Sequence, residues 1–121
     1  MIEIEAEVIH GRKIGRAMGF PTANMELTGY DDIERGVYRS SVEIDGVSYR
    51  AMSNVGIRPS VGGKELLLET HIIDYSGNLY GRRLRVVLIE KIRDEKRFAS
   101  IGDLRDQLLR DYDYIRTYGC E

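Results

Sequence analysis

The middle of the chain reads Val37-Tyr-Arg-Ser-Ser-Val-Glu-Ile44, then Asp45-Gly46, then Val47-Ser-Tyr-Arg-Ala-Met-Ser-Asn-Val55. Both outer segments contain β-branched and aromatic residues, which are frequent in strands. Asp-Gly is favoured in two-residue hairpin turns, because the central residues of such a turn adopt positive φ. This stretch predicts an antiparallel hairpin and makes an antiparallel β fold the first hypothesis.

Further strands are expected on both sides of this hairpin. Apolar residues alternate with glutamates over residues 2–9, which is the pattern of a half-buried strand. Residues 66–75 also resemble a strand, and after a turn at 76–78 residues 84–92 return antiparallel. Residues 25–36 are polar and are predicted to be a loop. Residues 56–64, with glycines at both ends and basic residues inside, are predicted to be a second, flexible loop.

Only the end of the chain is predicted to be helical. Ser100 can cap the helix, and Asp103 stands three residues later in a capping-box position. One apolar stripe is expected, formed by Ile101, Leu104, Leu108, Tyr112 and Ile115. Five or six strands followed by one helix predict a small antiparallel barrel that the helix plugs or flanks.

Composition limits the class of protein. The 121 residues are expected to form one domain, and 42% hydrophobic with 31% charged residues is typical of a soluble globular protein. A net charge of −2 gives no overall attraction to nucleic acid or to a membrane, and no apolar run is long enough to span a bilayer. The single Cys120 excludes an internal disulfide, so a cytoplasmic location is expected.

A glycine-rich segment carries the first candidate site: Gly11-Arg-Lys-Ile-Gly-Arg-Ala-Met-Gly-Phe-Pro-Thr-Ala-Asn24. Glycines allow close approach of the backbone to a ligand, and the cations between them suit a polyphosphate. Pro21 favours extended backbone, so Thr22 and Asn24 are expected to present two oxygens on one side, as Mg²⁺ requires. A plain turn is the alternative, since neither a P-loop nor a dinucleotide-binding pattern is present.

The strand at residues 66–75 carries the second candidate. Both of its faces are mostly apolar, which predicts a central strand, yet Glu69 lies on one of them. A partly desolvated carboxylate can act as a general base near neutral pH. The strand pattern alone favours the alternative, a structural ion pair with one of the arginines. His10 and His71 make a poor zinc set, because their spacing fits no zinc motif.

Two other charged features have simpler interpretations. Eight tyrosines and several strand arginines could stack nucleobases, but alternating strands normally expose one polar face, so solvated arginines are expected. The run Asp94-Glu-Lys-Arg97 is interpreted as a solvated turn into the helix.

Several motifs together resemble those of riboflavin kinases, including the kinase module of bacterial bifunctional riboflavin kinase/FAD synthetases. In chain order they are Gly15-Arg-x-x-Gly-Phe-Pro-Thr-Ala-Asn24, Gly36-Val-Tyr38, Asn54-Val-Gly-Ile-Arg-Pro59, Glu69-Thr-His-Ile-Ile-Asp74, Leu79-Tyr-Gly81, Ile92-Arg93, Lys96-Arg-Phe98 and the final helix with Leu104. The resemblance covers nearly the whole chain. It implies an all-β fold, a six-stranded antiparallel Greek-key barrel with a C-terminal α-helix, as one riboflavin kinase domain over residues 1–121.

The resemblance also implies an activity: Mg²⁺-dependent transfer of the ATP γ-phosphoryl group to the terminal ribityl hydroxyl of riboflavin, giving FMN and ADP. Thr22 and Asn24 match the positions that bind Mg²⁺ and phosphate in the family, and Glu69 matches its proposed general base. Gly15 and Gly19 match the phosphate-covering loop, and Arg16 stands where the family often has Arg or Lys. Riboflavin and ATP are therefore the expected partners, without nucleic acid or membrane.

Three alternatives stay open at this point. The first is a flavin-binding barrel that has lost catalysis, although the joint presence of Thr22, Asn24 and Glu69 argues against it. The second is a nucleic-acid-binding barrel, which the acidic balance disfavours. Third, bacterial members usually carry an N-terminal FMN adenylyltransferase, and no nucleotidyltransferase-like histidine motif is found here. The chain is thus expected to be a module of a bifunctional enzyme or a stand-alone kinase.

Overall fold

The computed structural model describes residues 1–9, 22–30, 32–60 and 63–117, with backbone alone at 58–60, 63 and 64. In this part of the chain six strands form a closed barrel in the order β1-β2-β5-β4-β3-β6, and every pair is antiparallel. The elements are β1 (Ile2–Ile9), β2 (Ala23–Glu26), β3 (Gly36–Ile44), β4 (Val47–Ser60), β5 (Gly63–Ile72), β6 (Arg83–Arg93) and the helix α2 (Ile101–Thr117). Because β2 pairs with β5 rather than with β3, the connection is of the Greek-key type, and the expected fold is confirmed.

The central hairpin is confirmed in detail. β3 and β4 pair from Ile44↔Val47 to Gly36↔Val55, so Asp45 and Gly46 form the two-residue turn. Their φ values are 51° and 82°, both positive as this turn requires.

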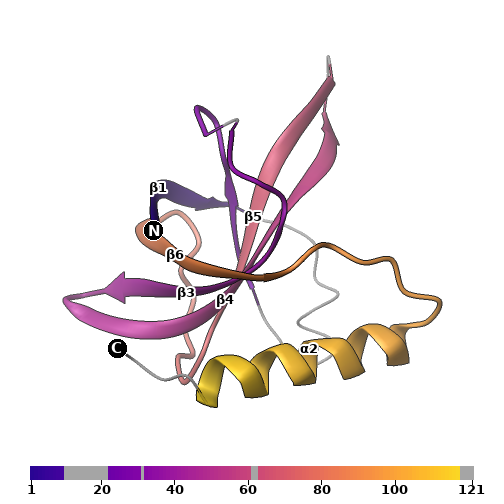
Figure 1. Cartoon of the computed structure of the whole chain (residues 1–121). Helices are drawn as coiled ribbons and strands as arrows, with labels where there is room; N and C mark the ends of the chain where they lie inside the picture. The colour runs from indigo at the N-terminus through magenta and orange to yellow at the C-terminus, as the bar shows by residue number, and fades with distance from the viewer. Residues whose placement is uncertain (10–21, 31, 61–62, 118–121) are drawn as a thin grey trace.

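Two hydrophobic clusters lie on opposite sides of the barrel wall. The interior cluster takes alternate residues of all six strands, among them Ile4, Met25, Val42, Val55, Leu68 and Val86. The second cluster lies outside, where α2 covers one side of the barrel (Figure 1). It joins Val37, Met52 and Ile73 to Ile115 of the helix. The helix therefore flanks the barrel and does not plug it.

The predicted helix stripe is partly wrong. Ser100 caps α2 as expected, since its Oγ accepts a hydrogen bond from the amide of Asp103 at 3.1 Å. Ile101, however, is 68% exposed, because the helical members of the outer cluster begin only at Leu108. The first turn of α2 therefore lies beyond the apolar cluster.

Two predicted loops are also corrected. The segment 25–36 contains the end of β2, residues 56–60 belong to β4, and residues 63–64 belong to β5. These two strands stay paired as far as Ser60↔Gly63 and form a long hairpin that projects from the barrel (Figure 1). The pairing continues past Gly56 and Pro59, so these residues do not end the strand. No helix among the described residues is long and apolar enough to cross a membrane.

Candidate active site

Three polar side chains lie in one row across neighbouring strands. Asn24 of β2 is directly paired with Glu69 of β5, and Glu69 is directly paired with Asn54 of β4. The next residues along the strands, Met25 and Leu68, are paired with each other and lie in the interior cluster. Because side chains alternate along a strand, the polar row faces outward. Directly paired Cβ atoms are about 5 Å apart, so these groups can act on one ligand.

The row is partly buried although it faces outward. Asn24 is only 4% exposed, and Glu69 is half-buried. Two residues along the same face of β5, the ring of His71 lies 5.9 Å from the ring of Tyr112 on α2. The helix therefore borders the site on that side.

Asn24 contains an unsatisfied acceptor. Its Nδ2 donates to the backbone carbonyl of Thr22 at 3.3 Å, whereas its Oδ1 is buried and has no hydrogen-bond partner in the described structure. A buried acceptor without a partner costs about 1–3 kcal/mol, so such groups usually have a ligand or another function. A neutral oxygen in this state fits a hard cation such as Mg²⁺.

The site residues expected from the sequence are placed as follows. Thr22 is half-buried and immediately precedes β2, so it lies next to the Asn24–Glu69 pair. Gly15, Arg16 and Gly19 lie outside the described residues. The described ranges contain no group of three or more His, Cys, Asp or Glu that could hold a metal ion.

Glu95 also contacts the polar row, which its sequence context did not indicate. Its Oε2 accepts a hydrogen bond at 3.3 Å from Nδ2 of Asn54, at the end of the polar row. Asp94 forms an ion pair with Lys91, and Lys96 donates to Gln107 at 3.3 Å. The segment interpreted as a solvated turn is thus held to the barrel and to the helix. A glycine inside a strand, Gly56, was the available signal, since it often marks close approach of another group.

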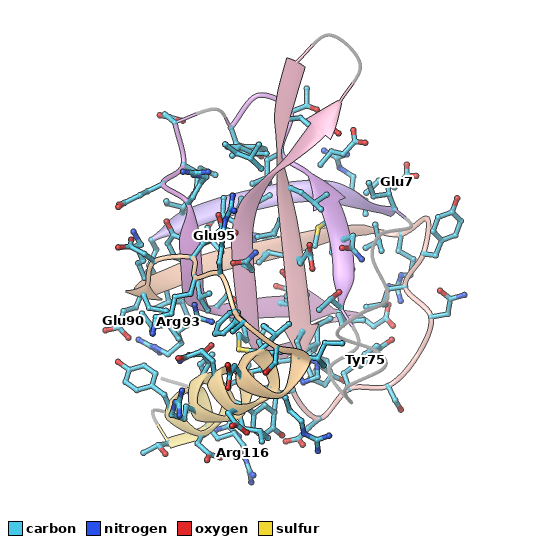
Figure 2. All side chains as sticks on the ribbon, turned by 90° about the vertical axis from the view of Figure 1, so that its right-hand side faces the viewer. Glu7, Tyr75, Glu90, Arg93, Glu95 and Arg116 are labelled. Atoms are coloured by element: carbon cyan, nitrogen blue, oxygen red, sulfur yellow. The ribbon has the colours of Figure 1, made fainter. Side chains whose placement is uncertain are left out.

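The segment is anchored by a buried ion pair between β6 and α2. Arg93 contacts Asp111 through Nη2–Oδ2 at 2.7 Å and through Nε at 3.1 Å to both carboxylate oxygens. Gln107 donates to the same carboxylate at 3.0 Å. Figure 2 shows Arg93 and Glu95 on the side of the barrel that carries the helix.

Charge pairing also fixes the end of β6. Lys91 lies between the carboxylates of Asp94 and Glu34, at 2.5 and 2.6 Å. Hydrogen bonds to both partners raise the pKa of Lys91, and the hydrogen bond from Lys91 lowers the pKa of Asp94. Both groups are therefore charged at neutral pH, and their ion pair holds the backbone that immediately precedes Glu95.

Comparison with known proteins decides the family. The family model described as Flavokinase, riboflavin kinase, matches residues 1–119. The chain belongs to the riboflavin kinase family. It is 44% identical over 109 residues to a bifunctional riboflavin kinase/FMN adenylyltransferase of Pseudomonas fluorescens, and 43% identical over 111 residues to that of Escherichia coli K12. In both comparisons the match covers 89% of this chain and 35% of the relative, so the chain spans about a third of their length.

Two solved structures share the fold of this family member. A Streptococcus pneumoniae chain described as a macrolide-efflux protein superposes with a TM-score of 0.84 at 33% identity, covering 97% of this chain and 39% of that one. A riboflavin kinase from Trypanosoma brucei superposes with a TM-score of 0.64 at 19% identity, covering 96% of this chain and 78% of that one.

Proposed function

We propose that this chain transfers the ATP γ-phosphoryl group to the terminal ribityl hydroxyl of riboflavin, as an ATP:riboflavin 5′-phosphotransferase. The observation that carries the proposal is the direct pairing of Asn24, whose Oδ1 is buried and unsatisfied, with the half-buried Glu69. Membership of the riboflavin kinase family supports a phosphoryl-transfer role for this pair. Of the two activities in the relatives' names, we propose only the kinase activity for these residues.

Each side chain has a role in this proposal. The Glu69 carboxylate accepts the proton of the ribityl hydroxyl while that oxygen bonds to the γ-phosphorus and the bond to ADP breaks. General-base assistance of this kind contributes about 10²- to 10⁴-fold in rate. The oxygens of Thr22 and Asn24 hold the metal, and Gly15, Arg16 and Gly19 bind the phosphates. When bound, Mg²⁺ neutralises the charge that develops on the phosphate oxygens.

The experiment is an assay of FMN formation. The protein is incubated with riboflavin and MgATP, with EDTA in a parallel sample, and the flavins are separated by chromatography. Metal-dependent formation of FMN is the expected result. Tight riboflavin binding without turnover would instead favour an inactive flavin-binding barrel.

Glu69→Gln tests the base. It keeps the shape of the side chain and removes the proton acceptor, so we expect turnover to fall at least tenfold, with riboflavin binding retained. Glu43→Gln, on an exposed position of β3, is the matched control. Unchanged turnover in Glu69→Gln would rule out Glu69 as the base.

Asn24→Leu tests the metal-site assignment without turnover. The substitution removes the unsatisfied Oδ1 and also the 3.3 Å hydrogen bond from Nδ2 to Thr22, so the two effects oppose each other and the thermal stability of the ligand-free protein should change little. The same variant should lose the stabilisation that MgADP gives to the wild type, and Thr22→Ala should weaken it. Equal stabilisation by MgADP in wild type and Asn24→Leu would refute the assignment.

A further inference from the structure

Glu95 lies over a gap in the outer face of β4. A Cβ atom added to Gly56 would lie 2.6 Å from Oε2 of Glu95 and 3.4 Å from Nδ2 of Asn54. A separation of 2.6 Å is too short for a carbon and an oxygen, so the carboxylate occupies this position only because residue 56 is glycine.

The backbone on either side of Glu95 is fixed independently. Before it, Arg93 is bound to the buried carboxylate of Asp111, and Lys91 holds Asp94. After it, Lys96 donates to Gln107 of α2. The backbone at Glu95 is therefore already ordered, and the hydrogen bond to Asn54 has only the side-chain rotamers of this exposed residue left to fix.

The contact reaches the proposed base through Asn54. An amide NH₂ group has two hydrogens, and the bond to Glu95 uses one of them. Because a carboxylate can only accept, the bond requires the Asn54 nitrogen, and not its oxygen, to face Glu95. It also holds the Asn54 amide in the row beside Glu69. An oriented amide next to a carboxylate restricts where that carboxylate, or a hydroxyl bound to it, can lie.

We propose that Glu95 is a positioning residue of the active site, seated over Gly56 and acting through Asn54 on the group at Glu69. The inference rests on the proposed kinase function for its effect on rate. The contact itself can be measured without turnover.

The kinetic test is a double-mutant cycle. Glu95→Ala should lower kcat about three- to tenfold, as expected for the loss of one ordinary, solvent-exposed hydrogen bond, with KM for riboflavin and ATP within about twofold. Gly56→Ala should have the same effect, because the clashing atom is the end of a flexible side chain that can move away. The double variant should be no slower than either single variant.

Two controls separate positioning from general damage. Glu95→Gln keeps an oxygen that can accept the hydrogen bond from Asn54, so this variant should retain most of kcat. Glu43→Ala removes a surface carboxylate from the distant end of β3 and should leave kcat unchanged. Additive losses in the double variant would show that Gly56 acts independently of Glu95 and would overturn the proposal. Full loss of kcat in Glu95→Gln would do the same.

The second readout is NMR. The chain contains three asparagines and one glutamine, so its side-chain NH₂ signals are few and the Asn54 pair can be assigned by substitution. Glu95→Ala and Gly56→Ala should shift that pair, and Glu43→Ala should not. An unmoved Asn54 signal would overturn the proposal, as would a shifted signal with unchanged kcat. A wild-type chain that forms no FMN would refute the kinase function, whereas the contact would still be decided by the Asn54 signal.

Discussion

Asp111→Ala should strongly destabilise the fold. The side chains of Asp111 and Arg93 are 5% and 14% exposed, and three nitrogen–oxygen distances between them are 3.1 Å or less. Removal of one partner leaves a guanidinium desolvated without its counter-charge, and Nε2 of Gln107 loses its acceptor as well. Breaking a buried pair in this way costs about 3 kcal/mol or more.

This cost should be visible in equilibrium unfolding. A loss of about 3 kcal/mol corresponds to a fall in Tm of about 10 °C for a chain of this length, and to a shift of about 2 M in the urea midpoint. Asp113→Ala, two residues further along the helix and exposed, is the control and should change stability by less than about 0.5 kcal/mol. Equal midpoints for the two variants would refute the reasoning, because the ion pair would then contribute no more than a surface charge.

Three further outcomes are expected in unfolding experiments. Gly36→Ala should cost about 2–4 kcal/mol, because Gly36 has φ +152° and an added Cβ would lie 2.7 Å from the carbonyl oxygen of Arg93; a loss below 1 kcal/mol would contradict this. Ser53→Ala should cost about 1–3 kcal/mol, because its buried Oγ bonds two other buried hydroxyls, at 2.7 and 2.8 Å; a stability equal to that of an exposed serine variant would contradict this. Stability should fall as pH rises above about 10, because burial raises the pKa of Tyr38 from 10.0 and hydrogen bonds raise the pKa of Lys91 from 10.5. Both groups stabilise the fold fully below their unfolded-state pKa values, and this stabilisation is lost as the pH passes their folded-state pKa values. Constant urea midpoints up to pH 11 would refute this.

Most of the fold follows from local patterns in the sequence. The alternation in residues 2–9 and the Asp45-Gly46 turn each specify a conformation within a few residues, and both are observed. β2 was expected only as extended backbone as far as Asn24, because four residues carry too little periodicity to be recognised as a strand. Ile101 was misplaced because its burial depends on how far the outer cluster extends along α2, which is a tertiary property.

The sequence indicates which residues belong to the candidate site, but it does not show how they are arranged in space. Thr22, Asn24 and Glu69 are identifiable from their motifs, but the pairing of Asn24 with Glu69 depends on the register of two strands that are distant in sequence. The run Asp94–Arg97 is exposed, as expected, and Glu95 was missed because its contact with Asn54 depends on tertiary structure. Only the space left by Gly56 on another strand gives it a binding position.

Closure of the barrel has a consequence for synthesis of the protein. β1 pairs with β6 through contacts such as Ile4↔Val86, which join the beginning of the chain to a segment made much later. A ribosome adding about 5–20 residues per second needs several seconds to make the intervening chain, and during that time β1 cannot pair with β6. Sheets built on such distant pairs form slowly. The alternating glutamates of β1 give the unpaired strand a charged face, which opposes its association with other nascent chains.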